Sequence, residues 1–206
     1  MIVANYVAVI LLALVGQPDA ADRGPGISRN SSDVQSYRAD AQLTDDGLAA
    51  LRLPPQLKRL NLSGTKITTA GLIHLKALRQ LKFLSLNDTQ IDDAGLVHLV
   101  GLSGLKSLSL NETPVSNAGV DHLSDMTHLQ ILCLDNTEVT DMGLRRLAKL
   151  NRLEWLYLND VKISDAGLLH LEGLTKLKFL SVIGTNVTNA GIKRLQRAVP
   201  TVRIRR

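Results

Sequence analysis

A repeat of 24 residues governs most of this sequence. Successive copies align without a gap and share the pattern L-x-x-L-x-L-x-x-T-x-[IV]-[ST]-[DN]-x-G-L-x-x-L-x-x-L-x-x. Six copies include the first half of the pattern, and they begin at Leu57, Leu81, Leu105, Leu129, Leu153 and Leu177. A unit this short cannot bury its own leucines, so the copies must stack into a solenoid.

The spacing of the leucines changes within each copy. Alternating leucines such as Leu84 and Leu86 predict a short strand. Leucines three apart, such as Leu72 and Leu75, line one side of a short helix. A glycine such as Gly71 recurs in every copy, and we expect the neighbouring coil to approach it too closely for a Cβ. Side chains suited to helix N-caps precede the helices, often followed by Asp or Asn, at Thr68, Asp92, Ser116, Thr140, Ser164 and Thr188.

The stretch LKFLSLNDTQIDDAGLVHLVGL, residues 81–102, closely resembles the leucine-rich repeat family, specifically 24-residue bacterial-type repeats with T-D-x-G-L after the strand. The resemblance covers residues 43–206 and implies an α/β fold: a right-handed solenoid with parallel strands on the concave face and short helices on the convex face. Six rungs would form an arc of roughly 25–30 Å. This chain carries Thr where the family usually has Asn, and Thr can still bond the backbone. Val161 breaks that column, which predicts a weaker rung there.

The N-terminal region differs from the repeats. Its apolar run, residues 6–15, suits the core of a signal peptide and is too short to span a bilayer. We therefore expect a signal peptide over residues 1–21 and an exported, periplasmic or secreted protein. Membrane anchoring through the apolar run is the alternative. Residues 22–42 are expected to be a linker and a degenerate N-terminal cap, and residues 43–206 the repeat domain, with a C-terminal cap from about residue 193.

Aromatic residues are scarce, and several occupy outward-facing strand positions. Trp155 and Tyr157 stand between leucines of one strand, so the resemblance places them on the concave face. Polar residues follow the same strands, and aromatic anchors beside polar groups are typical of recognition surfaces. The predicted binding residues are Trp155, Tyr157, Ile131, Phe179, Phe83, Asp135, Asn159, Asp160, Asn111 and Glu112. The alternative is that the aromatics only cover the sheet by packing across strands.

Charge and composition limit the other function classes. The formal net charge of +5 is below a nucleic-acid footprint, and the single cysteine, Cys133, excludes an intramolecular disulfide. Four histidines share one column on the helical side, where no Cys or carboxylate joins them at ligand spacing. The leucine core separates them from the strand serines, whereas a nucleophile and its base need direct contact.

The sequence therefore predicts a non-catalytic module that binds a protein or peptide on its concave face. We expect no cofactor, no metal, no nucleic-acid partner and no stable membrane insertion once the signal peptide is removed. A structural or self-associating solenoid without a dedicated ligand is the alternative. A hydrolytic enzyme is the third hypothesis, and no motif in the sequence favours it.

Overall fold

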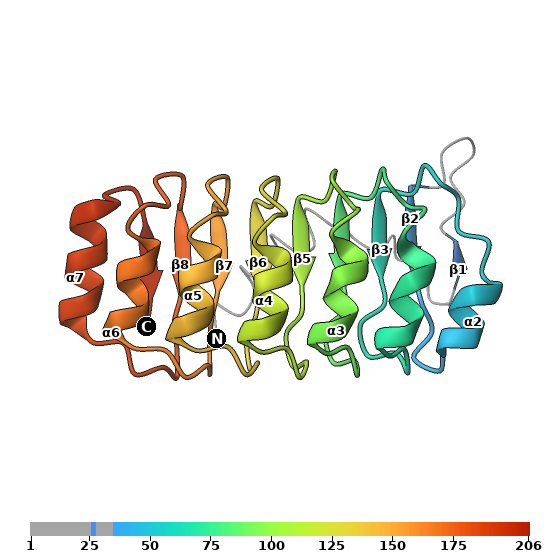
Figure 1. Cartoon of the computed structure of the whole chain (residues 1–206), viewed down its shortest axis with the longest axis horizontal. Coiled ribbons are helices and arrows are strands. Elements are labelled where there is room, and N and C mark those ends of the chain that lie inside the picture. Colours follow the sequence, from blue (N-terminus) through green and yellow to red (C-terminus); the bar gives the residue numbers. More distant parts are fainter. Residues whose placement is uncertain (1–25, 28–34) are drawn as a thin grey trace.

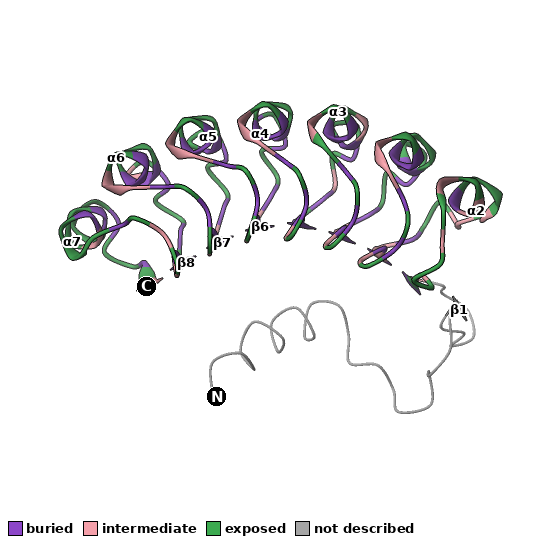
Figure 2. Cartoon of the chain, turned by 90° about the horizontal axis from the view of Figure 1, so that it is seen from below, coloured by how far each residue is buried: buried purple, intermediate pink, exposed green. Residues whose placement is uncertain are grey.

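The computed structural model describes residues 26–27 and 35–206. The expected signal peptide and most of the expected linker lie outside these residues. The described part forms one sheet of nine strands in the order β1 to β9. The strands line the inner side of an arc and the helices line its outer side (Figure 1, Figure 2). No helix in this part of the chain is long and apolar enough to cross a membrane.

The elements are short and alternate along the chain. The strands are β1 (Gly26–Ile27), β2 (Ser36–Arg38), β3 (Arg59–Asn61), β4 (Phe83–Ser85), β5 (Ser107–Ser109), β6 (Ile131–Cys133), β7 (Trp155–Tyr157), β8 (Phe179–Ser181) and β9 (Arg203–Arg205). The α-helices are α2 (Asp45–Ala50), α3 (Asp93–Leu96), α4 (Asn117–Leu123), α5 (Asp141–Leu147), α6 (Asp165–Leu168) and α7 (Asn189–Ala198). The 3-10 helices are η1 (Thr69–Leu75), η2 (Val97–Leu99) and η3 (Leu169–Leu171).

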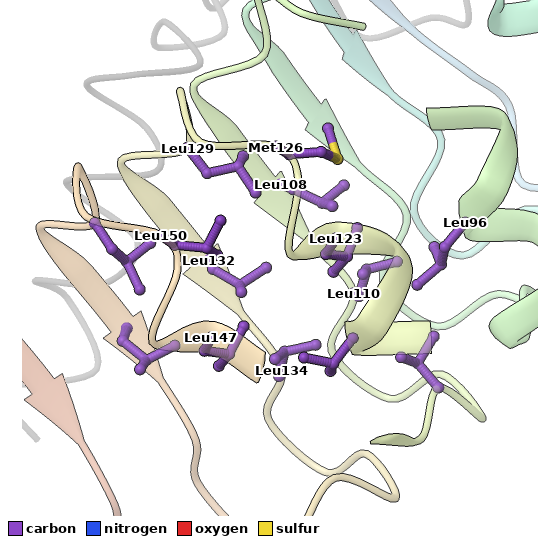
Figure 3. Close-up of a cluster of buried hydrophobic side chains, with 14 of the residues drawn as sticks. Leu96, Leu108, Leu110, Leu123, Met126, Leu129, Leu132, Leu134, Leu147 and Leu150 are labelled. Carbon is purple, nitrogen blue, oxygen red and sulfur yellow. The ribbon is translucent and has the colours of Figure 1, made fainter. Parts of the chain in front are cut away.

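The repeat length sets the register of the sheet. Leu132 of β6 lies between Leu108 of β5 and Leu156 of β7, which are one repeat away on either side. All three side chains are fully buried, and the leucines of strands and helices fill the space between the two layers (Figure 3). The parallel solenoid with inner strands and outer helices is thus confirmed.

The solenoid has two more rungs than the six predicted from the sequence, because β2 and β9 also pair in parallel with their neighbours. In β2, Tyr37 stands beside Leu60 and is 8% exposed, so it fills a leucine position. In β9, Ile204 stands beside Leu180. Neither segment keeps the full leucine pattern, so the sequence predicted them only as parts of the degenerate N-terminal cap and the C-terminal cap. β1 pairs antiparallel with β2 at the other end of the sheet.

The helix starts are tied to the preceding rung. The predicted caps Thr68 and Ser164 accept hydrogen bonds from backbone N–H groups of their own helices. In addition, the carboxylate of Asp141 accepts the N–H of Ser164 at 2.8 Å and its hydroxyl at 2.7 Å. The same pair of bonds joins Asp45 to Thr68, Asp93 to Ser116 and Asp165 to Thr188. The acidic residue therefore stabilises two neighbouring helices.

Thr140 is the one predicted cap without a side-chain capping bond. An amide, Asn117, replaces the acid of the preceding rung, and its Nδ2 donates to the Thr140 hydroxyl at 2.9 Å. The Thr140 hydroxyl accepts this bond and makes none to the backbone of α5, so Thr140 caps the helix through its backbone conformation alone.

The recurring glycine leaves room for the acidic or amide side chain of the preceding rung. A Cβ on Gly143 would lie 2.7 Å from Asn117 Oδ1, and one on Gly167 would lie still closer to Asp141 Oδ1. The predicted close approach of the neighbouring coil is therefore present. The group that approaches is the side chain that bonds the next helix cap.

The threonine column bonds the backbone as expected. In five rungs the hydroxyl donates to the carbonyl three residues earlier, as from Thr113 to Leu110 at 2.6 Å. Val161 is buried at the equivalent position and has no hydroxyl, so its rung lacks this bond.

Candidate functional site

The concave face carries an apolar cluster that is separate from the leucine core. It consists of Ile131, Cys133, Trp155, Tyr157 and Phe179, which we call the aromatic platform. Ile131, Trp155 and Phe179 lie side by side on strands β6, β7 and β8. The ring centroids of Trp155 and Phe179 are 5.5 Å apart, and those of Tyr157 and Phe179 are 5.4 Å apart. Both ring pairs are tilted, a favourable arrangement for aromatic side chains.

The members of the platform differ in exposure. Tyr157 is 3% exposed and Ile131 is 7% exposed, whereas Trp155 and Phe179 are half-buried. The accessible apolar surface is therefore formed mainly by Trp155 and Phe179, and the buried Tyr157 packs against Phe179. The cross-strand packing anticipated by the sheet-cover alternative is present. A binding role for the outer ring faces stays a prediction.

The structure does not join Phe83 to this cluster. Its ring lies on β4, two strands from Ile131, and the small Ser107 lies between them. The guanidinium carbon of Arg59 lies 5.2 Å from the Phe83 ring centroid, within cation–π range. Phe83 thus belongs to a separate part of the face, which is lined by serines.

A polar ladder runs beside the strands where each one ends. It consists of Asn87, Asn111, Asp135 and Asn159, and the Oδ1 atom of each accepts a backbone N–H from the next rung. The shortest of these bonds joins the Asn159 N–H to Asp135 at 2.7 Å. Three of these residues were predicted to contact a partner. Their first task is to hold neighbouring rungs together, and the side chain of Asn159 also hydrogen-bonds Asp135.

The next column has an unusual backbone. Asp88, Glu112, Asn136 and Asp160 have φ between 51° and 57°, in the left-handed region that favours glycine. Glycines occupy the same column in the flanking rungs, at Gly64 and Gly184. Those two glycines could have revealed the backbone requirement from the sequence. All four non-glycine side chains are exposed.

Burial and neighbouring carboxylates control ionisation on this face. Burial raises the pKa of Asp135, and the charges of Asp160 and Glu112 raise it further against two hydrogen bonds that lower it. Burial raises the pKa of the Cys133 thiol to about 12, so the thiol stays protonated at neutral pH. Burial likewise raises the pKa of Tyr157. The platform offers apolar contact area beside these carboxylates, and burial disfavours the nucleophilic thiolate form of Cys133.

The histidine column lies on the opposite side of the molecule. Its members belong to the outer helices, at His74 in η1, His98 in η2, His122 in α4 and His170 in η3. Among the residues that the structure describes, no group of three or more His, Cys, Asp or Glu side chains could hold a metal ion.

Comparisons with known proteins agree with the architecture. A family model described as Leucine Rich repeat matches residues 55–76 and 77–100. A search of curated proteins finds no match. The crystal structure of internalin C2 from Listeria monocytogenes superposes with a TM-score of 0.63 at 25% sequence identity, covering 83% of this chain and 80% of that one.

Two further solved structures show the same fold at lower identity. An internalin (inlF) from Listeria monocytogenes has a TM-score of 0.53 and 17% identity, covering 72% of this chain and 47% of that one. A leucine-rich repeat protein of Leptospira interrogans has a TM-score of 0.54 and 18% identity, covering 72% of this chain and 42% of that one. This chain thus matches less than half the length of these two proteins.

Proposed function

Because the chain belongs to the leucine-rich repeat family, we propose that it is a non-catalytic module that binds a protein or peptide partner on its concave face. The observation that carries the proposal is the aromatic platform. Its apolar side chains lie outside the leucine core, and Trp155 and Phe179 keep part of their ring surface accessible. Aromatic groups held rigid by their neighbours bury large area on binding at low entropic cost.

The rest of the concave face supports this assignment. The serine hydroxyls near the platform donate within the scaffold, as from Ser109 to Asn87 and from Ser181 to Asn159, both at 2.6 Å. Binding energy at this face would therefore come from ring surface and from the outer atoms of the polar ladder. An arc of this size can present about 800 Å² to a partner, which is enough for a standard interface.

Selection of peptides on the intact protein tests the proposal. Dodecapeptides from a random phage library are selected on the full chain, and their affinities are then measured for the Trp155→Ala variant. We expect Trp155→Ala to weaken binding at least about tenfold, as for an interface hot spot. Met142→Ala is the matched control, since Met142 is 62% exposed on the outer helix α5. Peptides that bind both variants as tightly as the original protein would contradict the proposal.

A structural, self-associating solenoid remains the competing function. Five large apolar side chains are exposed on the outer helices or just beyond them, at Ile73, Val97, Val100, Met142 and Leu169. Sedimentation velocity across protein concentration separates the two functions. A mass that stays monomeric while selected peptides require Trp155 supports the binding module. A stable dimer that protects Trp155 favours self-association.

A further inference from the structure

The concave face has an edge whose charge differs from that of the whole protein. The formal net charge is +5, yet the residues that follow strands β4 to β7 include four carboxylates, at Asp88, Glu112, Asp135 and Asp160. We call these four residues the acidic edge. In the described part of the chain none of them takes part in an ion pair. The opposite edge of the sheet, where the strands begin, carries Lys58, Lys82, Lys106 and Lys178.

Four carboxylates elsewhere on the molecule are paired with cations. On the outer face Arg194 contacts Glu172 at 2.8 Å and Arg146 contacts Asp121 at 3.2 Å. At the start of β7, Glu154 contacts Lys178 at 2.6 Å. The acidic edge is thus a region where the fold itself supplies no counter-charge to a row of acids.

The fold does not need these charges. Asp88, Glu112 and Asp160 occupy left-handed backbone positions where glycine, as in Gly64 and Gly184, is relaxed. Their side chains make no hydrogen bond within residues 26–27 and 35–206. Asp135 occupies a ladder position that is Asn in the neighbouring rungs, and an amide oxygen would accept the same backbone bond. These charges are therefore available for contacts with a partner.

The acidic edge borders the aromatic platform. Asp160 follows Trp155 and Tyr157 in β7, and Asp135 follows Ile131 and Cys133 in β6. Asp135 is close enough to Tyr157 to influence its ionisation, and Asp160 and Glu112 influence Asp135 in turn. A ligand seated on the exposed rings would therefore bring its flanking groups beside these carboxylates.

We propose that the partner presents a basic segment in which Lys or Arg side chains flank an apolar or aromatic side chain. The apolar group packs on Trp155 and Phe179, and the cations pair with Asp135, Asp160 and Glu112. This inference rests on the proposed binding function and specifies its partner. The Nδ2 group of Asn111, which makes no hydrogen bond in the described chain, can donate to a carbonyl of the segment. The positive charge elsewhere on the protein disfavours binding of such a segment outside the acidic edge.

Three synthetic heptapeptides of one pattern test the charge requirement. They alternate Arg, Glu or Ser with Leu, carry fluorescein, and are titrated with the full chain by fluorescence anisotropy. The test variant is Asp88→Asn/Glu112→Gln/Asp160→Asn, which removes three charges with almost no change of shape, and Asn tolerates the left-handed backbone. The control is Asp121→Asn/Asp125→Asn/Glu172→Gln on the outer face, which changes the net charge equally. Thermal unfolding by circular dichroism verifies that both variants fold.

We expect the Arg peptide to bind most tightly, to lose about tenfold in affinity in the test variant, and to bind the control unchanged. Its affinity should also fall as salt rises, because the carboxylates are solvent-accessible. An equal or tighter affinity for the Glu peptide, or an unchanged affinity of the Arg peptide for the test variant, would overturn the inference.

The proposed function and the charge inference fail differently. If Trp155→Ala weakens all three peptides while the test variant weakens none, the concave face binds peptides and the basic partner is wrong. If none of the three peptides binds the original protein, the basic partner is wrong, and the phage selection still tests the binding function. If the chain forms a dimer that the test variant dissociates, the acidic edge is occupied by a second copy, which also overturns the inference.

Discussion

The two halves of the concave face share one scaffold and differ in what they present. Strands β3 to β5 and strands β6 to β8 have the same register and the same buried leucines. Their outward columns differ, because the first half carries Ser85, Ser107 and Ser109 where the second carries larger groups such as Trp155 and Tyr157. The difference teaches that the repeat fixes the backbone, whereas the outward strand positions can change without disturbing it.

The serines of the first half and the aromatic residues of the second half find their contacts in different ways: the serines form hydrogen bonds within the scaffold, and the rings pack on one another. The hydroxyl of Ser109 donates to Asn87, and those of Ser63 and Ser85 are 2.7 Å apart, so these polar atoms have partners within the scaffold. In the second half, rings pack on rings, and part of Trp155 and Phe179 remains uncovered. The second half therefore offers a cluster of apolar side chains to a partner, whereas the first half offers the half-buried ring of Phe83.

The largest expected difference in stability is between truncations on the two sides of strand β7, one facing the leucine core and one facing outward. Leu156→Ala leaves a cavity in the leucine core and should lower the free energy of unfolding by about 3 kcal/mol. Trp155→Ala, one position earlier on the outward side, should cost about 1 kcal/mol through lost ring packing. Urea denaturation of both variants measures the difference. Equal losses would show that the platform is part of the core.

Two glycines of the same rung should differ in their tolerance of a Cβ, because one contacts the neighbouring rung and the other does not. In Gly167→Ala the new Cβ would collide with Asp141, so we expect a loss of about 2 kcal/mol in stability. In the matched control Gly173→Ala nothing lies within 4 Å of the new Cβ, so stability should stay the same or rise slightly. Thermal unfolding compares the pair. A Gly167→Ala variant as stable as Gly173→Ala would remove the role assigned to the acid–cap bonds.

The rung beneath the platform lacks a bond that the serine half possesses. Val161→Thr restores the hydroxyl that donates to a carbonyl three residues earlier, and it should raise the free energy of unfolding by about 1 kcal/mol. Thr113→Val removes the equivalent bond in the serine half and should lower it by about the same amount. Chemical denaturation of both variants measures the gain from the added hydroxyl and the loss from the removed one. A loss of stability in Val161→Thr would contradict this prediction.

The smallest expected effect concerns the charge of Asp135. Burial raises its pKa above the ordinary value of 3.8, so the folded chain favours the protonated form. The stability from this group is complete below pH 3.8 and is lost as the pH rises through the folded pKa. Asp135→Asn should therefore be slightly more stable than the original protein at pH 7, and the gain should vanish below about pH 3.8.

Asn111→Asp is the matched counterpart, since it adds a carboxylate to the serine-half end of the ladder and should lower stability at pH 7. Thermal unfolding at pH 7 and pH 3 measures both changes. A stability gain in Asp135→Asn that is the same at both pH values would rule out charge as the cause.

The spacing of the repeat predicted the strands, the helices and the buried leucines, but it did not predict the side-chain contacts between neighbouring rungs. The outward position of Trp155 and the burial of Leu156 follow from spacing alone. The burial of Tyr157 depends on the size of its neighbour Phe179, which a repeat pattern does not weigh. The bonds from Ser164 to Asp141 join residues of adjacent copies. A pattern within one copy therefore explains Asp141 only as an acid in the first turn of its own helix.

The central claim is that Trp155 forms part of an open platform that a partner covers. Acrylamide quenching of tryptophan fluorescence measures it directly, because Trp155 is the only tryptophan in the chain. The account predicts that the quencher reaches the ring at every protein concentration, and that the Arg–Leu peptide then protects it. Protection of Trp155 in the dilute, peptide-free monomer would contradict the account, because the ring would then serve only to cover the sheet.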